Sequence, residues 1–303
     1  MKKTLLPLLA LGLVLSASRS FSMPPVRLVL IDAKTIKAFG PMPWTRDRHA
    51  AIVSKLDAAG AKAIVLRFYY RDDRGDIGDR ALVAAVQKSG KVLCELGQSN
   101  GPEGWQPSEP WLAASALNAT GVHPRMLMSP KYLQAPFETL AHAAHGVGSI
   151  EVLINQDGKL EGIPLVIGYR NHLLPSLGLR TFLFAAGLET APVRIDAESV
   201  MRFWVFPSKE AKALLIDRAR VAINPYGCTL VNLTPPGRGY QTVSFVDVLQ
   251  GRTKPGVFKN AIVLVGAEDP KLDVRTETGA KSGLELVADQ IAALYHYAED
   301  ARR

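Results

Sequence analysis

The fold class can be read from residues 26–70, VRLVLIDAKTIKAFGPMPWTRDRHAAIVSKLDAAGAKAIVLRFYY. The first six residues are mostly apolar and rich in β-branched side chains, which is typical of a strand buried on both faces. After a proline-containing turn at residues 40–44, the apolar residues of segment 47–59 recur on one helical face, and Gly60 ends that segment. A second apolar run, at residues 62–70, predicts another strand.

This alternation of strand and helix continues along the chain. Residues 79–89 predict a helix and residues 91–96 a third strand, so the first third is a βαβαβ unit with a parallel sheet. A turn at Asp157-Gly158 predicts that the strands on either side of it are antiparallel neighbours. The remaining patterned segments predict strands at 146–154, 163–169 and 260–265, and helices at 177–187, 244–251 and 282–297.

Together these elements predict one α/β domain. We expect a mixed, largely parallel sheet with helices on both of its faces. Residues 97–110 are rich in Gly, Pro, Asn and Ser and indicate a loop-rich insertion. Residues 193–222 mix charged and aromatic side chains without a clear period, so no element is predicted there.

The N-terminus has the pattern of an export signal. Lys2 and Lys3 precede an apolar stretch at residues 5–15, and Ser20-Phe21-Ser22 has the small-x-small pattern of a cleavage site. That stretch is shorter than the roughly 20 residues that a bilayer-spanning helix requires. We expect residues 1–22 to be a signal peptide and residues 23–303 to form a periplasmic or secreted domain. The alternative is an uncleaved leader that acts as a membrane anchor.

Net charge bears on whether the protein binds nucleic acid, and the two cysteines bear on whether it contains a disulfide. The formal net charge is +8, and it falls to +5 when the three basic residues of the leader are removed. Because the basic residues form no stripe, nucleic acid is not an expected partner. Cys94 and Cys228 would be free to pair in an oxidising compartment. Cys94 lies in an apolar run, so a buried thiol remains the alternative to a disulfide.

Motifs for metals, cofactors and nucleophilic catalysis are missing from the sequence. His142 and His145 have no nearby third or fourth ligand for zinc, and residues 71–79 lack the ligand spacing of a calcium loop. We expect residues 71–79 to be a solvated loop in which Asp79 caps the next helix. Asp32-Ala33-Lys34 stands where a dinucleotide-binding glycine motif would begin, and no serine lies in a nucleophile elbow. No metal or cofactor is therefore expected.

The order of these segments resembles that of the CHASE2 domain, an extracytoplasmic sensory module of bacterial receptors. Residues 28–70 are similar to the family's strand ending in Asp, its Gly-x-Trp-Pro-Trp-x-Arg turn and its "L…aGAk.I.fD" continuation. Asp157-Gly158 and the segment LPSL at residues 174–177 resemble the family's central motifs. The segments SFVDVLQG, NAIVLVGAEDPKLDVRTETG and GLELVADQIAALY resemble its C-terminal motifs. The order of these strings over some 270 residues carries the resemblance.

Several positions depart from the family pattern. The first Trp of the turn motif is Met42, the carboxylate expected after the second strand is Arg67, the Arg after Asp-Gly is Glu161, and the His of the last motif is Val287. Any polar pocket that the family shares would therefore be altered in this chain. The resemblance implies a stand-alone exported sensory module, without the membrane helices and output domain that usually follow.

Ligands of open parallel sheets usually bind beyond the carboxyl ends of the strands. Asp32 and Gly266 follow predicted strands, and Trp44, Arg46 and Asp273 come from the adjoining turn and loop. We interpret these five residues as a candidate ligand-binding site. The alternative roles are structural, with Asp32 as a helix cap, Trp44 as a hydrophobic plug over the first crossover and Asp273 as an ordinary loop residue.

Three classes of function follow from these observations. The favoured class is an exported sensory module that binds a small molecule or docks on a membrane-bound signalling protein. The second is a non-catalytic interaction or scaffold protein of the cell envelope. The third, a hydrolytic enzyme that uses Asp32 or Asp273 as acid or base, lacks a complete catalytic constellation, so we do not expect an enzyme.

Overall fold

The central sheet joins strands from both ends of the chain. The computed structural model describes residues 22–202, 206–229, 233–235 and 239–303. In this part of the chain the main sheet has the order β15-β1-β16-β2-β3-β6, all parallel, and the end of β3 also pairs with the antiparallel β5. The bounds are β1 (Val26–Ile31), β2 (Ala63–Arg67), β3 (Val92–Ser99), β5 (Tyr132–Gln134), β6 (Gly146–Ser149), β15 (Gln241–Ser244) and β16 (Ile262–Ala267).

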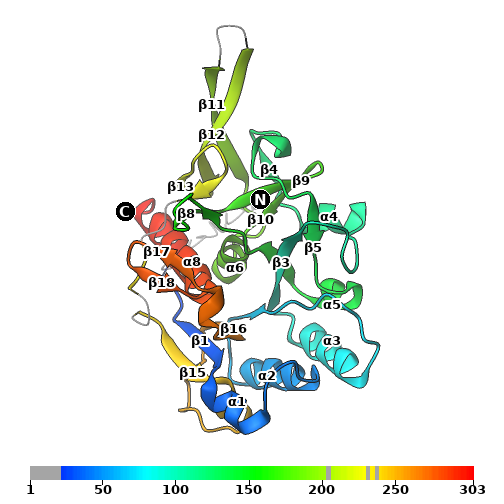
Figure 1. The fold of residues 1–303 in the computed structure, drawn as a ribbon. Coiled ribbons are helices and arrows are strands. Elements are labelled where there is room, and N and C mark those ends of the chain that lie inside the picture. Colours follow the sequence, from blue (N-terminus) through cyan, green and yellow to red (C-terminus); the bar gives the residue numbers. More distant parts are fainter. Residues whose placement is uncertain (1–21, 203–205, 230–232, 236–238) are drawn as a thin grey trace, which may run out of the picture.

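Helices cover both faces of this sheet, as the sequence predicts (Figure 1). One face packs against α2 (Asp47–Ala58), α3 (Ile77–Ser89), α5 (Glu138–Ala143) and α7 (Phe245–Leu249). The other packs against α6 (Leu177–Ala186) and α8 (Gly283–Asp300). The two faces alternate along each strand, so Ile64 and Leu66 face the first group of helices, and Ala63 and Val65 the second. This confirms the α/β fold class.

Shorter elements surround the sheet. The helical ones are α1 (Ala33–Phe39), α4 (Glu109–Ser115) and the 3-10 turns η1 (Pro124–Met126) and η2 (Pro270–Leu272). Small antiparallel sheets are built from β7 (Leu153–Ile154), β8 (Leu160–Pro164) and β14 (Cys228–Thr229), from β9 (Val166–Tyr169) and β10 (His172–Pro175), and from β17 (Val274–Thr276) and β18 (Gly279–Lys281). The last sheet contains β4 (Ala119–Thr120), β11 (Val193–Arg202), β12 (Phe206–Ile216) and β13 (Ala219–Ala222).

The segment for which no element is predicted forms a long hairpin. Strands β11 and β12 pair from Val193 and Ile216 at the body to Arg202 and Phe206 at the far end, and this arm projects from the rest of the molecule (Figure 1). Its sequence has no clean two-residue period because the ladder contains an irregularity at Asp196 and Ala197.

Several local predictions need correction. The strand expected at residues 146–154 divides into β6, which joins the central sheet, and β7. The strand expected at 163–169 divides likewise into β8 and β9, so the antiparallel pairing across Asp157-Gly158 holds for β7 and β8 alone. The expected loop at residues 97–110 is shorter, because β3 continues to Ser99 and α4 begins at Glu109.

The two cysteines do not pair. Cys94 lies in the central strand β3, whereas Cys228 lies in β14, which pairs with β8 in a separate sheet. Both are buried and free. The disulfide that the sequence left open is therefore not formed, and both residues fill space as small apolar side chains.

Candidate functional site

Asp32, at the end of β1, is held by its own neighbours. Its carboxylate accepts hydrogen bonds from the Thr35 backbone N–H at 2.9 Å, the Thr35 hydroxyl at 2.7 Å and the Ser244 hydroxyl at 2.8 Å. Burial alone would raise the pKa of this carboxyl, but these hydrogen bonds outweigh it and the pKa lies below its usual value. Asp32 therefore caps α1 as an ionised group, which is the structural role that the sequence left open.

Trp44 and Arg46 also have internal partners. The Trp44 ring is buried against Phe39 and Phe245, and its indole N–H donates to the Gly40 carbonyl at 3.0 Å. Arg46 is 5% exposed, and its guanidinium forms a 2.7 Å ion pair with Asp79. The sequence-based prediction that Asp79 caps α3 is wrong. Asp76 is the cap, and Asp79 instead forms the ion pair with Arg46.

The remaining two predicted residues lie near α8. Gly266 stands opposite Leu30 in the sheet, and a Cβ there would lie 2.9 Å from Leu284, so the glycine permits the close approach of α8. Asp273 follows η2 and borders a shallow surface hollow with Val274 and Arg275. Burial first, and then the neighbouring carboxylates, raise the pKa of Asp273. Trp44 lies in the apolar cluster on the α2 and α7 face of the sheet, and the Arg46 guanidinium packs over rings of that same cluster. Because α8 covers the other face, the five residues do not surround one pocket.

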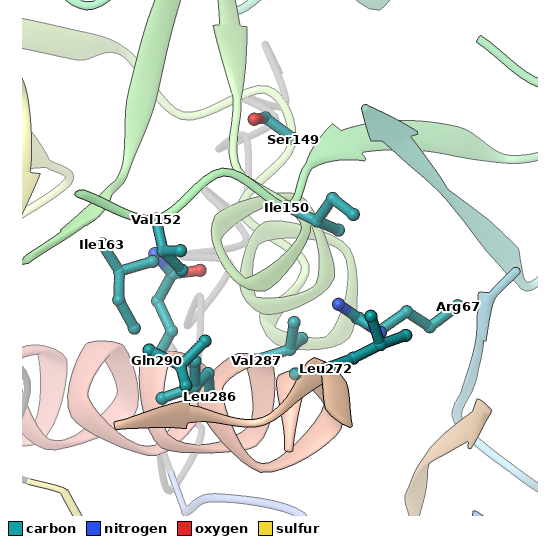
Figure 2. Close-up of a pocket in the computed structure, with 11 residues that line it drawn as sticks. Arg67, Ser149, Ile150, Val152, Ile163, Leu272, Leu286, Val287 and Gln290 are labelled. Carbon is teal, nitrogen blue, oxygen red and sulfur yellow. The ribbon is translucent and has the colours of Figure 1, made fainter. Parts of the chain in front are cut away.

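A partly enclosed cavity of about 60 Å³ lies beyond the carboxyl ends of β2 and β6, against α8 (Figure 2). This is the place where open parallel sheets usually bind ligands. Figure 2 shows Arg67 entering the cavity from the sheet side and Gln290 from α8. The lining is mostly apolar: Arg67, Ser149, Ile150, Val152, Ile163, Leu272, Val274, Gly283, Leu286, Val287 and Gln290.

Arg67 supplies the charge in this cavity. Its Nε atom is buried and has no hydrogen-bond partner among the residues that the structure describes. Its guanidinium lies so close to Gly283 that a Cβ at that position would collide with it. The absence of a side chain at the first residue of α8 therefore gives Arg67 the room it occupies.

Glu95 lies beside Arg67 on the same face of the sheet. The parallel pairing of β2 and β3 places Leu66 opposite Cys94, so Arg67 and Glu95 are one step further along. Glu95 is 4% exposed, and neither carboxylate oxygen accepts a hydrogen bond from a residue in the described ranges. Burial raises the pKa of Glu95 to about 7, and the charge of Arg67 opposes only part of that rise.

Sequence reasoning missed this pair as a functional feature, although part of the signal was visible. Arg67 and Val287 are two of the four positions that depart from the expected motifs, and both line the cavity. A charged residue inside the otherwise apolar run VLCEL, residues 92–96, was the only indication of Glu95. No pattern in the sequence shows that Arg67 and Val287 face one another across a cavity.

The whole chain from residue 4 to residue 303 matches the CHASE2 domain. The protein belongs to the CHASE2 family. CHASE2 domains are extracytoplasmic sensory domains, and the family is sensory rather than catalytic. No curated protein and no solved structure gives a significant match to this chain.

The match covers almost the same residues that carry the resemblance in the sequence. It includes the strand ends, α8 and the cavity between them, so the cavity is part of the CHASE2 domain itself. Most of the expected leader, residues 1–22, lies outside the described residues. In the ranges that the structure describes, no helix combines the length and the apolar character needed to cross a bilayer.

Proposed function

We propose that this CHASE2 domain is an exported sensory module that binds a small ligand in the cavity between α8 and the carboxyl ends of β2 and β6. The observation that carries the proposal is the Arg67 Nε, which has no hydrogen-bond partner in the described part of the chain and belongs to a mostly apolar, partly enclosed cavity. Ligand pockets typically combine apolar walls with a few well-placed polar groups. Of the five residues proposed from the sequence, Asp32, Trp44, Arg46 and Gly266 make internal structural contacts, and Asp273 borders a surface hollow.

Ligand binding can be tested by thermal unfolding against a panel of small metabolites. A compound that binds the native state raises the melting temperature. Val287→Met places a larger side chain in the cavity and should abolish the shift, whereas Ala293→Met, on the same helix but away from the cavity lining, should preserve it. An equal shift in wild type and Val287→Met would place the binding site elsewhere.

Export is the second part of the proposal. The leader pattern at residues 1–22 and the membership in an extracytoplasmic family both support it. We expect the protein, produced with its own leader in a Gram-negative host, to be recovered from the periplasm with Met23 as its first residue. Recovery of the full chain from the cytosol with Met1 intact would contradict export.

Signal output requires a partner, and a membrane-bound signalling protein is the partner that we propose. Support for it comes from family membership, because CHASE2 is a sensory domain family and a sensory domain has to pass its state to a signalling protein. Co-purification from membranes of the native host, repeated with Val287→Met, tests whether ligand and partner are coupled. If the wild type and Val287→Met captured the same partner equally, with and without ligand, the result would instead support the alternative of an interaction protein.

A further inference from the structure

The charge at the cavity has a specific environment. Among the residues that line the cavity, Arg67 alone is charged. Among the residues that the structure describes, Arg67 forms no ion pair, and Glu285 of α8 is not part of the cavity lining; its carboxylate accepts hydrogen bonds from the Ser282 backbone N–H and hydroxyl in the capping box. A partly buried cation without an anionic partner is unfavourable, so an anionic ligand would be stabilised there.

The walls limit the kind of anion. Seven apolar side chains line the cavity, and the polar atoms of Gln290 are already bonded to Ser176 and to the Pro164 carbonyl. Ser149 is the other polar residue of the lining. One guanidinium can neutralise one negative charge, so a second charge, as on a phosphate dianion, would remain uncompensated among apolar groups. A monocarboxylate with a short apolar body fits both the charge and the walls.

Glu95 competes with any such ligand for Arg67. When its buried carboxyl is neutral, the guanidinium charge is available to a ligand; when it is ionised, the same charge is balanced from inside the sheet. We propose that the cavity binds a short-chain monocarboxylate through Arg67 and that protonation of Glu95 is required for tight binding. This inference rests on the proposed ligand-binding function and names its ligand class.

Other groups near Glu95 must be considered. Tyr69 stays neutral because burial, and then Glu95, raise its pKa. On α6, Arg180 is held by the Val147 carbonyl, and on α8, Glu285 is held in the capping box. Glu151 follows β6 and receives a hydrogen bond from Gln98, and burial raises its pKa as well. Glu151 is therefore the second group whose titration the experiment has to separate.

Calorimetric titration with straight-chain monocarboxylates from acetate to hexanoate tests the proposal. These acids are ionised at both about pH 6 and about pH 8, so any change in affinity reports on the protein. We expect at least one of them to bind about tenfold more tightly at the lower pH, because the binding-competent fraction of Glu95 changes by that factor. The corresponding primary amides, which have the same shape without the charge, should bind at least tenfold more weakly at about pH 6.

Variants identify the groups involved. Arg67→Gln should abolish carboxylate binding and Arg67→Lys should retain part of it, whereas Arg27→Gln, which alters another strand arginine with a buried Nε away from the cavity lining, should leave it unchanged. Glu95→Gln should bind equally at both pH values, and Glu151→Gln should keep the wild-type pH dependence. Circular dichroism and melting curves establish that each variant is folded.

Three results would overturn the inference: no carboxylate of the series binds, the amides bind as well as the acids, or Glu95→Gln keeps the full pH dependence. Failure of the broader proposal is distinguishable from these results. If a metabolite outside this class raises the melting temperature and Val287→Met abolishes that effect, the cavity is a ligand site but not a carboxylate site. If no compound raises it, both proposals fail.

Discussion

Glu95 is a carboxylate placed inside a β-sheet without a hydrogen-bond donor in the described part of the chain. The usual pKa of a glutamate carboxyl is 4.5, and burial raises the pKa of Glu95 to about 7 in the folded protein. Between these values the folded protein binds more protons than the unfolded chain. The free energy of unfolding therefore falls as the pH rises through this range and stays low above it.

Glu95→Gln should remove this pH dependence. The wild type is expected to lose about 3 kcal/mol of stability between about pH 4.5 and about pH 7, a value that follows from the size of the pKa shift. Urea unfolding at several pH values measures the loss, and the variant should be the more stable protein above pH 7. Glu138→Gln, which changes an exposed carboxylate at the start of α5, is the control and should follow the wild type. If the free energy of unfolding of Glu95→Gln fell with pH as steeply as that of the wild type, the pH dependence would not come from Glu95.

The reactivity of the two buried cysteines, Cys94 and Cys228, can also be predicted. Burial raises the pKa of Cys94 to about 12 and that of Cys228 to about 11, so neither is a thiolate at neutral pH. We expect both thiols to react slowly with iodoacetamide in the native protein and rapidly after denaturation without reductant. Mass spectrometry should then show two added groups. A chain that takes up none would instead contain a disulfide.

Helix ends and glycines determine how the elements meet. The N-termini of α6 and α8 both lie over the carboxyl end of the sheet, where glycines replace side chains on the facing strands. A Cβ on Gly148 of β6 would collide with the backbone of Leu177 at the start of α6, and one on Gly266 would press on Leu284 of α8. Of these two helices, α8 contributes directly to the cavity, through Gly283, Leu286, Val287 and Gln290.

Gly148→Ala should therefore destabilise the protein by about 1–3 kcal/mol, since the backbone of α6 has to move to make room. Gly101→Ala is the matched control, because a Cβ at Gly101 would meet open space, and it should change stability by less than about 0.5 kcal/mol. Urea unfolding provides the comparison. Equal stability of the two variants would mean that α6 does not sit tightly on β6.

The C-terminal part of the chain completes the central sheet and covers one of its faces. Strand β16 inserts between β1 and β2, and α8 covers the same sheet, so residues far apart in sequence share one core. A fully buried ion pair between Lys281 of β18 and Asp289 of α8 anchors this region. Asp289 also accepts hydrogen bonds from Thr234 and Tyr240, each at 2.7 Å, which ties residues 234 and 240 to α8.

Lys281→Met should cost about 3–5 kcal/mol, because it leaves Asp289 as an unpaired buried charge. The double variant Lys281→Met with Asp289→Asn should recover much of that loss, since the amide oxygen still accepts from Thr234 and Tyr240 without the charge. Thermal unfolding measures the stability of the single and of the double variant. A double variant no more stable than the single one would show that lost packing, and not the unpaired charge, dominates.

The sequence by itself determined the family and most of the helices and strands of the central sheet. Short β-branched runs, one-sided helices, the capping box at Ser282 and Glu285 and the order of the motifs depend on neighbouring residues, so they can be read along the chain. Only the tertiary structure decided which of these residues meet. It assigned Asp32 and Arg46 to internal contacts, and it brought Arg67, Glu95 and Val287 together at one edge of the sheet. The pairing of distant strands and the packing of α8 against them set these contacts, and neither leaves a periodic signal in the sequence.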